Sequence, residues 1–128
     1  MPSYDAARFD PPAPLAYVNL RNPDSGAVRA EVPMLLDTGA DVTLVPAEIV
    51  RQLAASVLPD VGYELAGFDG SLSVVSAVRL ELVFCRRRFR GQFLVTDQTW
   101  GILGRNILNA IPLLLDGPGL VWEELRRG

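Results

Sequence analysis

Alternation of apolar and polar residues with a period of two is the feature that most constrains the fold of this chain. It is clearest in residues 28–34 and 78–84, where the regularly spaced apolar residues are Val28, Ala30, Val32 and Met34, and then Val78, Leu80, Leu82 and Phe84. Because successive side chains of a β-strand point to opposite faces, each stretch predicts a half-buried strand. Helical spacing is limited to about 46–55 and 105–110. The sequence therefore predicts an all-β domain with one or two short helices.

The length of 128 residues fits a single domain over residues 1–128. Residues 1–14 contain four prolines and predict an N-terminal arm or edge strand. Residues 113–125 contain two apolar runs joined by turn residues, which predicts a C-terminal hairpin. Val74-Val75 breaks the alternation of its segment and predicts a bend or bulge, and residues 86–90 predict a turn.

The composition removes several classes of active site. The chain has no histidine and no lysine, and Cys85 is its one cysteine. These absences exclude Ser-His-Asp and Cys-His nucleophilic sites, histidine metal ligands, Cys-rich zinc sites and Schiff-base lysines. Chemistry is left to carboxylates, hydroxyls and backbone amides, and we expect no cofactor and no resident metal.

The net charge and the length of the apolar runs indicate whether nucleic acid or a membrane is a partner. The net charge of −3 does not favour a general nucleic-acid binder. No apolar run approaches the roughly 20 residues of a membrane span, and residues 1–14 do not resemble a secretory signal. We therefore expect a cytoplasmic protein that binds neither nucleic acid nor membrane.

The most informative segment for chemistry is Leu35-Leu36-Asp37-Thr38-Gly39-Ala40-Asp41. It places a carboxylate directly after an apolar strand, in a turn whose glycine permits tight dihedral angles and close backbone approach. The Thr38 hydroxyl can bond a neighbouring backbone group and hold the turn rigid. Taken alone, Asp-Thr-Gly is also an ordinary turn between two strands.

A second segment favours a functional interpretation of the Asp-Thr-Gly turn. It reads Gly101-Ile102-Leu103-Gly104-Arg105-Asn106-Ile107-Leu108. The pair LLDTGADVT and GILGRNIL, in this order and with a glycine-bearing hairpin candidate between them, resembles the retropepsin-like aspartic protease family. The resemblance covers roughly residues 15–115 and implies a closed β-barrel that acts as a homodimer. It also implies an aspartic endopeptidase that hydrolyses extended polypeptides.

The resemblance assigns expected roles to individual residues. It implies that Asp37 is catalytic within the Asp37-Thr38-Gly39 turn, and that the segment of Ile102, Leu103, Gly104, Arg105 and Asn106 supports this turn from below. It implies substrate contacts from Ala40 and Asp41, and from the flap Gly67-Phe68-Asp69-Gly70. It further implies that Asp41 pairs with Arg105 and that Thr38 locks the two turns across the dimer. A structural ion pair without a substrate role is the alternative for Asp41 and Arg105.

One Asp-Thr-Gly per chain is the observation that demands a dimer. Aspartic peptidase chemistry uses two carboxylates that share one proton, one as base toward water and the other as acid toward the scissile carbonyl. Asp116-Gly117 follows an apolar run but has no Thr or Ser between its Asp and Gly. If the chain is such an enzyme, Asp37 must therefore meet its own copy across a two-fold axis. Residues 113–125, with or without the N-terminal arm, are the candidate for the dimer sheet.

Two other interpretations remain open at this level. The fold can serve as a catalytically silent dimerisation or peptide-binding module, because fold does not imply function. The run Cys85-Arg86-Arg87-Arg88-Phe89-Arg90 can serve as a basic patch for nucleic acid, although a solvated hairpin turn explains it more simply. Cys85 itself predicts a small buried or edge thiol rather than a reactive one.

Overall fold

The computed structural model describes residues 2–66 and 72–126, which form ten strands and two short helices. The strands are β1 (Tyr4–Asp5), β2 (Ala13–Arg21), β3 (Val28–Leu36), β4 (Leu44–Pro46), β5 (Val57–Ala66), β6 (Leu72–Phe84), β7 (Arg87–Thr96), β8 (Gly101–Leu103), β9 (Leu113–Asp116) and β10 (Val121–Glu124). The helices are α1 (Ala47–Gln52) and α2 (Arg105–Leu108). None of the helices in these ranges has the length and apolar character required to cross a bilayer.

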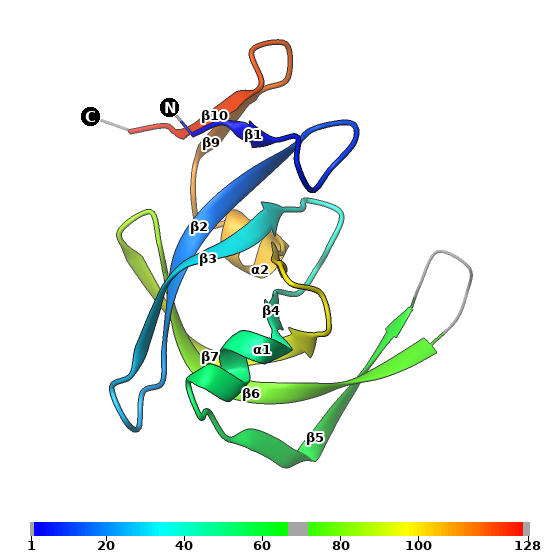
Figure 1. Ribbon diagram of the computed structural model, residues 1–128, viewed down its shortest axis with the longest axis vertical. Coiled ribbons are helices and arrows are strands. Elements are labelled where there is room, and N and C mark those ends of the chain that lie inside the picture. Colours follow the sequence, from blue (N-terminus) through cyan, green and yellow to red (C-terminus); the bar gives the residue numbers. More distant parts are fainter. Residues whose placement is uncertain (1, 67–71, 127–128) are drawn as a thin grey trace.

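Six of the strands close into a barrel (Figure 1). The main sheet runs β1-β2-β3-β8-β4-β7-β6-β5, and an additional pairing of β2 with β6 closes the ring from β2 to β6. The pairs β3–β8 and β4–β7 are parallel, and the remaining pairs of the ring are antiparallel. The predicted all-β barrel with short helices is confirmed.

The barrel interior is filled by the residues that the alternation selects. Val78, Leu80, Leu82 and Phe84 of β6 are all buried, as predicted. In β3, however, Val32 and Met34 are buried whereas Val28 is 56% exposed. The register of β3 against β2 shifts between Val18 and Leu20, and Glu31 has φ of 59°. This bulge reverses the face on which the first residues of β3 lie, because one extra residue exchanges the two sides of a strand.

Two local predictions around β6 are wrong. The pairing of β6 with β5 is regular through Val74-Val75, and the irregularity lies instead in β5, between Leu58 and Gly62. Arg87 to Arg90 belong to β7 rather than to a turn, since the turn consists of Cys85 and Arg86, with φ of 51° and 61°. Two residues with positive φ match the twist of a tight hairpin, which leaves the following arginines free to pair with β6.

The two ends of the chain meet where the N-terminal arm joins the two-stranded sheet of β9 and β10 to β2 of the main sheet. β9 and β10 form the predicted C-terminal hairpin, and the N-terminal arm adds to it by a bridge between Ser3 and Val121. The Tyr4 N–H donates to the Leu120 carbonyl at 2.7 Å, and the Trp122 N–H donates to the Pro2 carbonyl at 2.9 Å. Trp122 is buried against the barrel. The arm therefore contributes the edge strand β1 of the main sheet, which is one of the two forms predicted for it.

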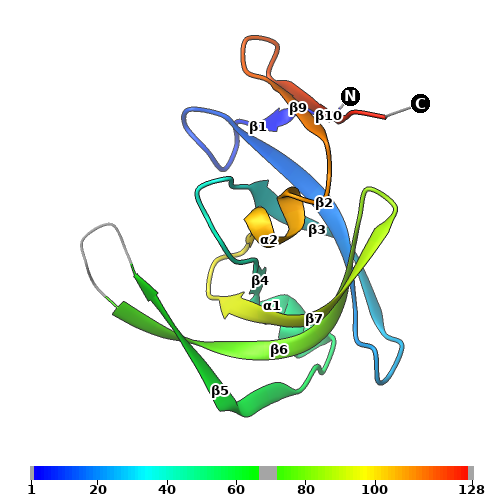
Figure 2. The same ribbon diagram turned by 180° about the vertical axis from the view of Figure 1, so that it is seen from behind.

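The connection between β3 and β4 carries Asp37. In Figures 1 and 2, seen from opposite sides, this connection and the far ends of β5 and β6 lie on the same side of the barrel. The β9–β10 hairpin lies at one end of the molecule and β5 lies at the other (Figure 1). The Asp37 turn therefore lies between the terminal hairpin and the long β5–β6 arm.

Candidate active site

Asp37 begins a turn that hydrogen bonds hold on several sides. Its N–H donates to the Leu103 carbonyl at 3.1 Å, and its own carbonyl accepts the Ala40 N–H at 3.2 Å. One carboxylate oxygen, Oδ1, accepts the Gly39 N–H at 2.9 Å. A side chain at Gly39 would bring its Cβ to 3.1 Å from that same oxygen. The turn thus fixes the direction of the half-buried Asp37 carboxylate. Thr38 and Gly39, at the tip of the turn, are exposed to solvent.

The segment 101–106 lies beside this turn. β8 is inserted between β3 and β4, with Ile102 opposite both Leu35 and Leu44. Gly104 follows β8, and a Cβ there would lie 2.1 Å from the Val42 carbonyl oxygen. Such a distance is far inside van der Waals contact, so the two backbones meet at a point where only glycine fits. Because the two segments touch through their backbones, the two motifs together indicate this site more strongly than either motif does alone.

Thr43 joins the two segments and was not among the predicted site residues. Its hydroxyl accepts the Gly104 N–H at 3.1 Å and donates to Oδ1 of Asn106 at 2.8 Å. The side chain of Thr43 is almost fully buried, so both bonds form away from competing water. Thr43 is the last residue of the LLDTGADVT segment, but its bonding role is not evident from that segment because its partners lie more than sixty residues further along the chain.

Arg105 binds the turn differently from the prediction. Its backbone N–H donates to the Ala40 carbonyl at 2.8 Å, and its Nη1 donates to the Thr38 carbonyl at 2.7 Å. Within residues 2–66 and 72–126 it forms no ion pair with Asp41, so the expected pairing is wrong for the single chain. Asp41 is exposed, and an exposed carboxylate gains little from an ion pair because it stays hydrated. Arg105 is a positioning residue that clamps two carbonyls of the turn.

The remaining predicted residues divide into two groups. The Ala40 carbonyl accepts the Arg105 backbone N–H and Asp41 is exposed, and their expected substrate contacts stay a prediction. Gly67, Phe68, Asp69 and Gly70 lie outside the described residues, so their expected flap role stays a prediction. Within the described ranges, no group of three or more His, Cys, Asp or Glu side chains is arranged to hold a metal ion.

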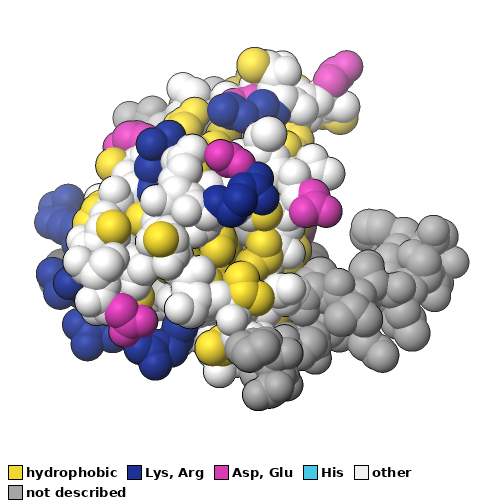
Figure 3. All heavy atoms as spheres, turned by 60° about the horizontal axis from the view of Figure 1, so that its bottom comes forward, with side chains coloured by type: hydrophobic (Ala, Val, Ile, Leu, Met, Phe, Trp, Pro, Cys, Tyr) yellow, Lys and Arg dark blue, Asp and Glu magenta, His cyan; other side chains and the backbone are white. Residues whose placement is uncertain are grey.

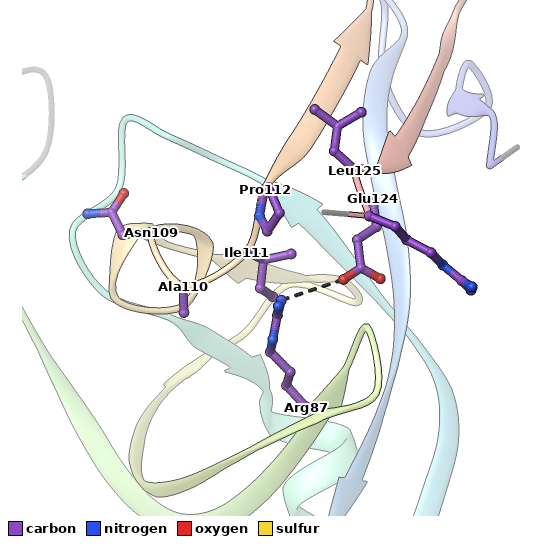
Figure 4. Close-up of a pocket in the computed structure, with 8 residues that line it drawn as sticks. Arg87, Asn109, Ala110, Ile111, Pro112, Glu124 and Leu125 are labelled. Carbon is purple, nitrogen blue, oxygen red and sulfur yellow. Dashed lines mark ion pairs between the residues drawn. The ribbon is translucent and has the colours of Figure 1, made fainter. Parts of the chain in front are cut away.

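A surface pocket of about 690 Å³ lies between the segment 109–112 after α2, the start of β7 and the end of the C-terminal hairpin (Figure 4). Arg87 points across it to Glu124, with an Nη1–Oε2 distance of 3.5 Å. The other lining residues shown are Asn109, Ala110, Ile111, Pro112 and Leu125. The pocket is lined by this ion pair, by Arg126 and by no nucleophile, so it offers no chemistry comparable to that of the Asp37 turn.

Three of the four arginines after Cys85, namely Arg87, Arg88 and Arg90, lie near carboxylates of the same chain. Arg90 Nε lies 2.7 Å from Oε2 of Glu81, and Arg88 Nε lies 4.0 Å from Oε1 of the same residue. The Glu81 carboxylate is buried beneath these side chains. Arginine side chains gather along one side of the molecule (Figure 3). Because several of their charges are used internally, this surface favours a structural role over a nucleic-acid site.

Cys85 should react slowly with alkylating reagents. Burial, together with the nearby Glu124 carboxylate, raises the pKa of its thiol to about 11 from 9.0. A rise of this size leaves about a hundredfold less thiolate near neutral pH, and the thiolate is the reacting form. We expect iodoacetamide to modify Cys85 about a hundredfold more slowly in the folded chain than in urea at the same pH. Equal rates, measured by mass spectrometry, would show that the thiol is not shielded.

The comparisons with known proteins support the fold. No protein-family model and no curated protein matches the chain. Among solved structures, the EIAV protease complexed with the inhibitor HBY-793 is similar with a TM-score of 0.58 and 23% sequence identity. The similarity covers 77% of this chain and 86% of that one. The predicted retropepsin-like fold is thereby confirmed, and the similarity shows the fold alone.

Proposed function

We propose that the protein is an aspartic endopeptidase and that its active form is a homodimer in which each copy contributes Asp37. The observation that carries the proposal is the hydrogen-bonded Asp37-Thr38-Gly39 turn, held against β8 and α2 by Thr43 and Arg105. The retropepsin-like fold supports it, because the structural neighbour with this fold is named a protease.

The chemistry follows from two carboxylates that face each other. Like charges at short distance cannot both ionise, so the pair holds one proton between them. The ionised Asp37 removes a proton from a water molecule, and the oxygen of that water attacks the scissile carbonyl carbon. The protonated Asp37 of the second copy donates its proton to the carbonyl oxygen. The first Asp37 then passes the proton that it took from water to the amide nitrogen, while the second Asp37 takes a proton back from one hydroxyl of the tetrahedral intermediate. The C–N bond breaks, the amine and the carboxylic acid leave, and the pair again holds one proton.

The geometry of each turn prepares one half of this site. The bond from Gly39 to Oδ1 fixes the carboxylate before substrate arrives, so little reorganisation is needed at reaction. Ala40 and Asp41 follow directly and are placed to contact an extended substrate backbone, which can add as a strand. The β5–β6 arm lies on the same side of the barrel and is proposed to cover the bound peptide (Figure 1).

The test is hydrolysis of an unstructured polypeptide by the purified chain, with the fragments identified by mass spectrometry. We expect internal cleavage that is fastest below neutral pH, where a carboxyl pair retains its shared proton. The rate per chain should rise with chain concentration until the dimer is saturated. If the chain binds such polypeptides without cutting them at any pH, it is the silent peptide-binding module instead.

A further inference from the structure

A buried carboxylate on the outer face of the barrel is surrounded by three arginines. Glu81 of β6 is only 2% exposed, and its neighbours along the strand point into the barrel, so its own side chain points outward. Arg21 of β2 and Arg90 of β7 lie directly opposite Glu81 on the two neighbouring strands. Arg88 lies two residues before Arg90 and reaches the same carboxylate. We call Arg21, Arg88 and Arg90 the arginine triad.

One carboxylate leaves most of the triad's charge uncompensated. Arg90 Nε donates to Oε2 of Glu81 at 2.7 Å, whereas Arg21 and Arg88 approach the carboxylate only to 4.0 Å, beyond hydrogen-bond distance. The side chains of Arg21, Arg88 and Arg90 are 40%, 69% and 71% exposed. A guanidinium carries five N–H donors, so most donors of the triad face solvent. Within the described part of the chain, three positive charges thus meet one negative charge at this place.

The sheet fixes the spacing within the triad. Residues two apart on one strand are separated by about 6.8 Å, which is the spacing of Arg88 and Arg90. Arg21 lies two strands away from Arg90, which corresponds to about 9.6 Å. An extended polypeptide also repeats its side chains on one face every 6.8 Å or so, and acidic side chains at alternate residues therefore match Arg88 and Arg90. The bond to Glu81 holds Arg90 in place beforehand, which lowers the entropy lost on binding.

The surroundings of the triad favour a short acidic segment over a nucleic acid. The whole chain carries a net charge of −3, so the triad is a small cationic area on an acidic molecule. A nucleic acid binds through many phosphates along its length, and its strand would run on past the triad over the acidic remainder. A polypeptide segment with only a few carboxylates ends within the cationic area and avoids that repulsion.

We propose that the arginine triad docks an extended acidic polypeptide segment, whose alternate carboxylates pair with Arg88 and Arg90 while Arg21 contributes the third cation. The β2–β3 and β6–β7 hairpins, which carry the triad, lie on the side of the barrel away from the connection that holds Asp37 (Figures 1 and 2). A segment bound there leaves the Asp37 turn open. The docking surface is therefore separate from the proposed active site and does not depend on catalysis.

Fluorescence anisotropy with a labelled peptide of alternating Glu and Ser tests the docking surface. All chains carry Asp37→Asn, so that the peptide stays whole, and the salt is kept at about 50 mM, where screening is weak. We expect Arg88→Gln to raise the Kd at least about threefold, because it removes one exposed charge-assisted contact. Arg51→Gln is the matched control, since Arg51 is also 69% exposed and the variant loses the same charge from α1. We expect its Kd to equal that of the parent chain.

Three further arms decide the outcome. A peptide with Gln in place of every Glu should not bind, and Arg88→Gln should melt at the same temperature as the parent chain, which excludes unfolding as the cause of weaker binding. Equal weakening by Arg88→Gln and Arg51→Gln would reduce the effect to general charge attraction and overturn the proposal. A single-stranded oligonucleotide that binds more tightly than the acidic peptide, and loses affinity in Arg88→Gln, would assign the triad to nucleic acid instead. Failure of the acidic peptide to bind the parent chain would also overturn the docking surface.

Discussion

We expect Asp37→Asn to abolish the proposed peptide hydrolysis and to leave the fold intact. The asparagine side chain keeps an oxygen where Asp37 Oδ1 accepts the Gly39 N–H at 2.9 Å, so the turn retains its hydrogen bond. The amide can neither take a proton from water nor hold one for the scissile carbonyl. Positioned acid and base groups contribute roughly 10²–10⁴-fold each, so we expect kcat/KM to fall by about a thousandfold or more.

The control for this variant is Asp24→Asn. Asp24 lies in the β2–β3 turn, away from Asp37, and pairs with the exposed Arg79 at 3.0 Å. Exposed ion pairs contribute little to stability, so this variant should match the wild-type chain in both activity and thermal unfolding. Residual hydrolysis within about tenfold of wild type in Asp37→Asn, with an unchanged melting curve, would mean that this carboxylate performs no step of the reaction.

Gly104→Ala is expected to have the largest effect on stability. A Cβ at this position would lie 2.1 Å from the carbonyl oxygen, 2.6 Å from the carbonyl carbon and 2.9 Å from the nitrogen of Val42. All three atoms are backbone, so no flexible side chain can turn aside, and the chain at Val42, just before β4, must separate from the start of α2. That movement also breaks the bond from the Gly104 N–H to Thr43. We expect a loss of about 3 kcal/mol or more in the free energy of unfolding.

Gly117→Ala is the matched substitution for this measurement. A Cβ at Gly117 meets nothing within 4 Å, and the change in unfolded-chain entropy is the same for both variants. Urea unfolding at one fixed chain concentration compares them, because dimerisation adds to apparent stability. Equal stability of the two variants, within about 0.5 kcal/mol, would contradict the close contact between Val42 and Gly104.

The sequence predicted the parts of the fold that follow from local pattern. The apolar spacing of Val78 to Phe84 predicted which face of β6 is buried, and the structure places those residues in the barrel. The turn at Asp37 and the segment at Gly104 were predicted as neighbours because two motifs in a fixed order resembled a family. Each of these signals lies within a few consecutive residues, so a single sequence is enough to read it.

What the sequence missed depends on contacts between distant segments. The bulge at Glu31 exposes Val28, and only the register of β3 against β2 reveals it. Thr43 ends the LLDTGADVT segment, but its role was missed because it depends on Gly104 and Asn106, which the barrel brings beside it.

Arg105 shows a different limit of sequence analysis. The residue was correctly placed beside the turn, but its partner was predicted to be Asp41. The choice between an exposed carboxylate and the carbonyl of Thr38 depends on hydration and on the direction of the guanidinium. Neither is encoded in residue spacing.

Mixing wild-type and Asp37→Asn chains tests most directly whether two copies of Asp37 form one site. After subunit exchange at equal proportions, two-fold association gives about one quarter wild-type dimers. If both carboxylates are required, the mixture retains about one quarter of the activity of the same total amount of wild-type chain, and the activity follows the square of the wild-type fraction. Activity that falls in direct proportion to the wild-type fraction, with exchange verified by mass spectrometry, would contradict a shared site.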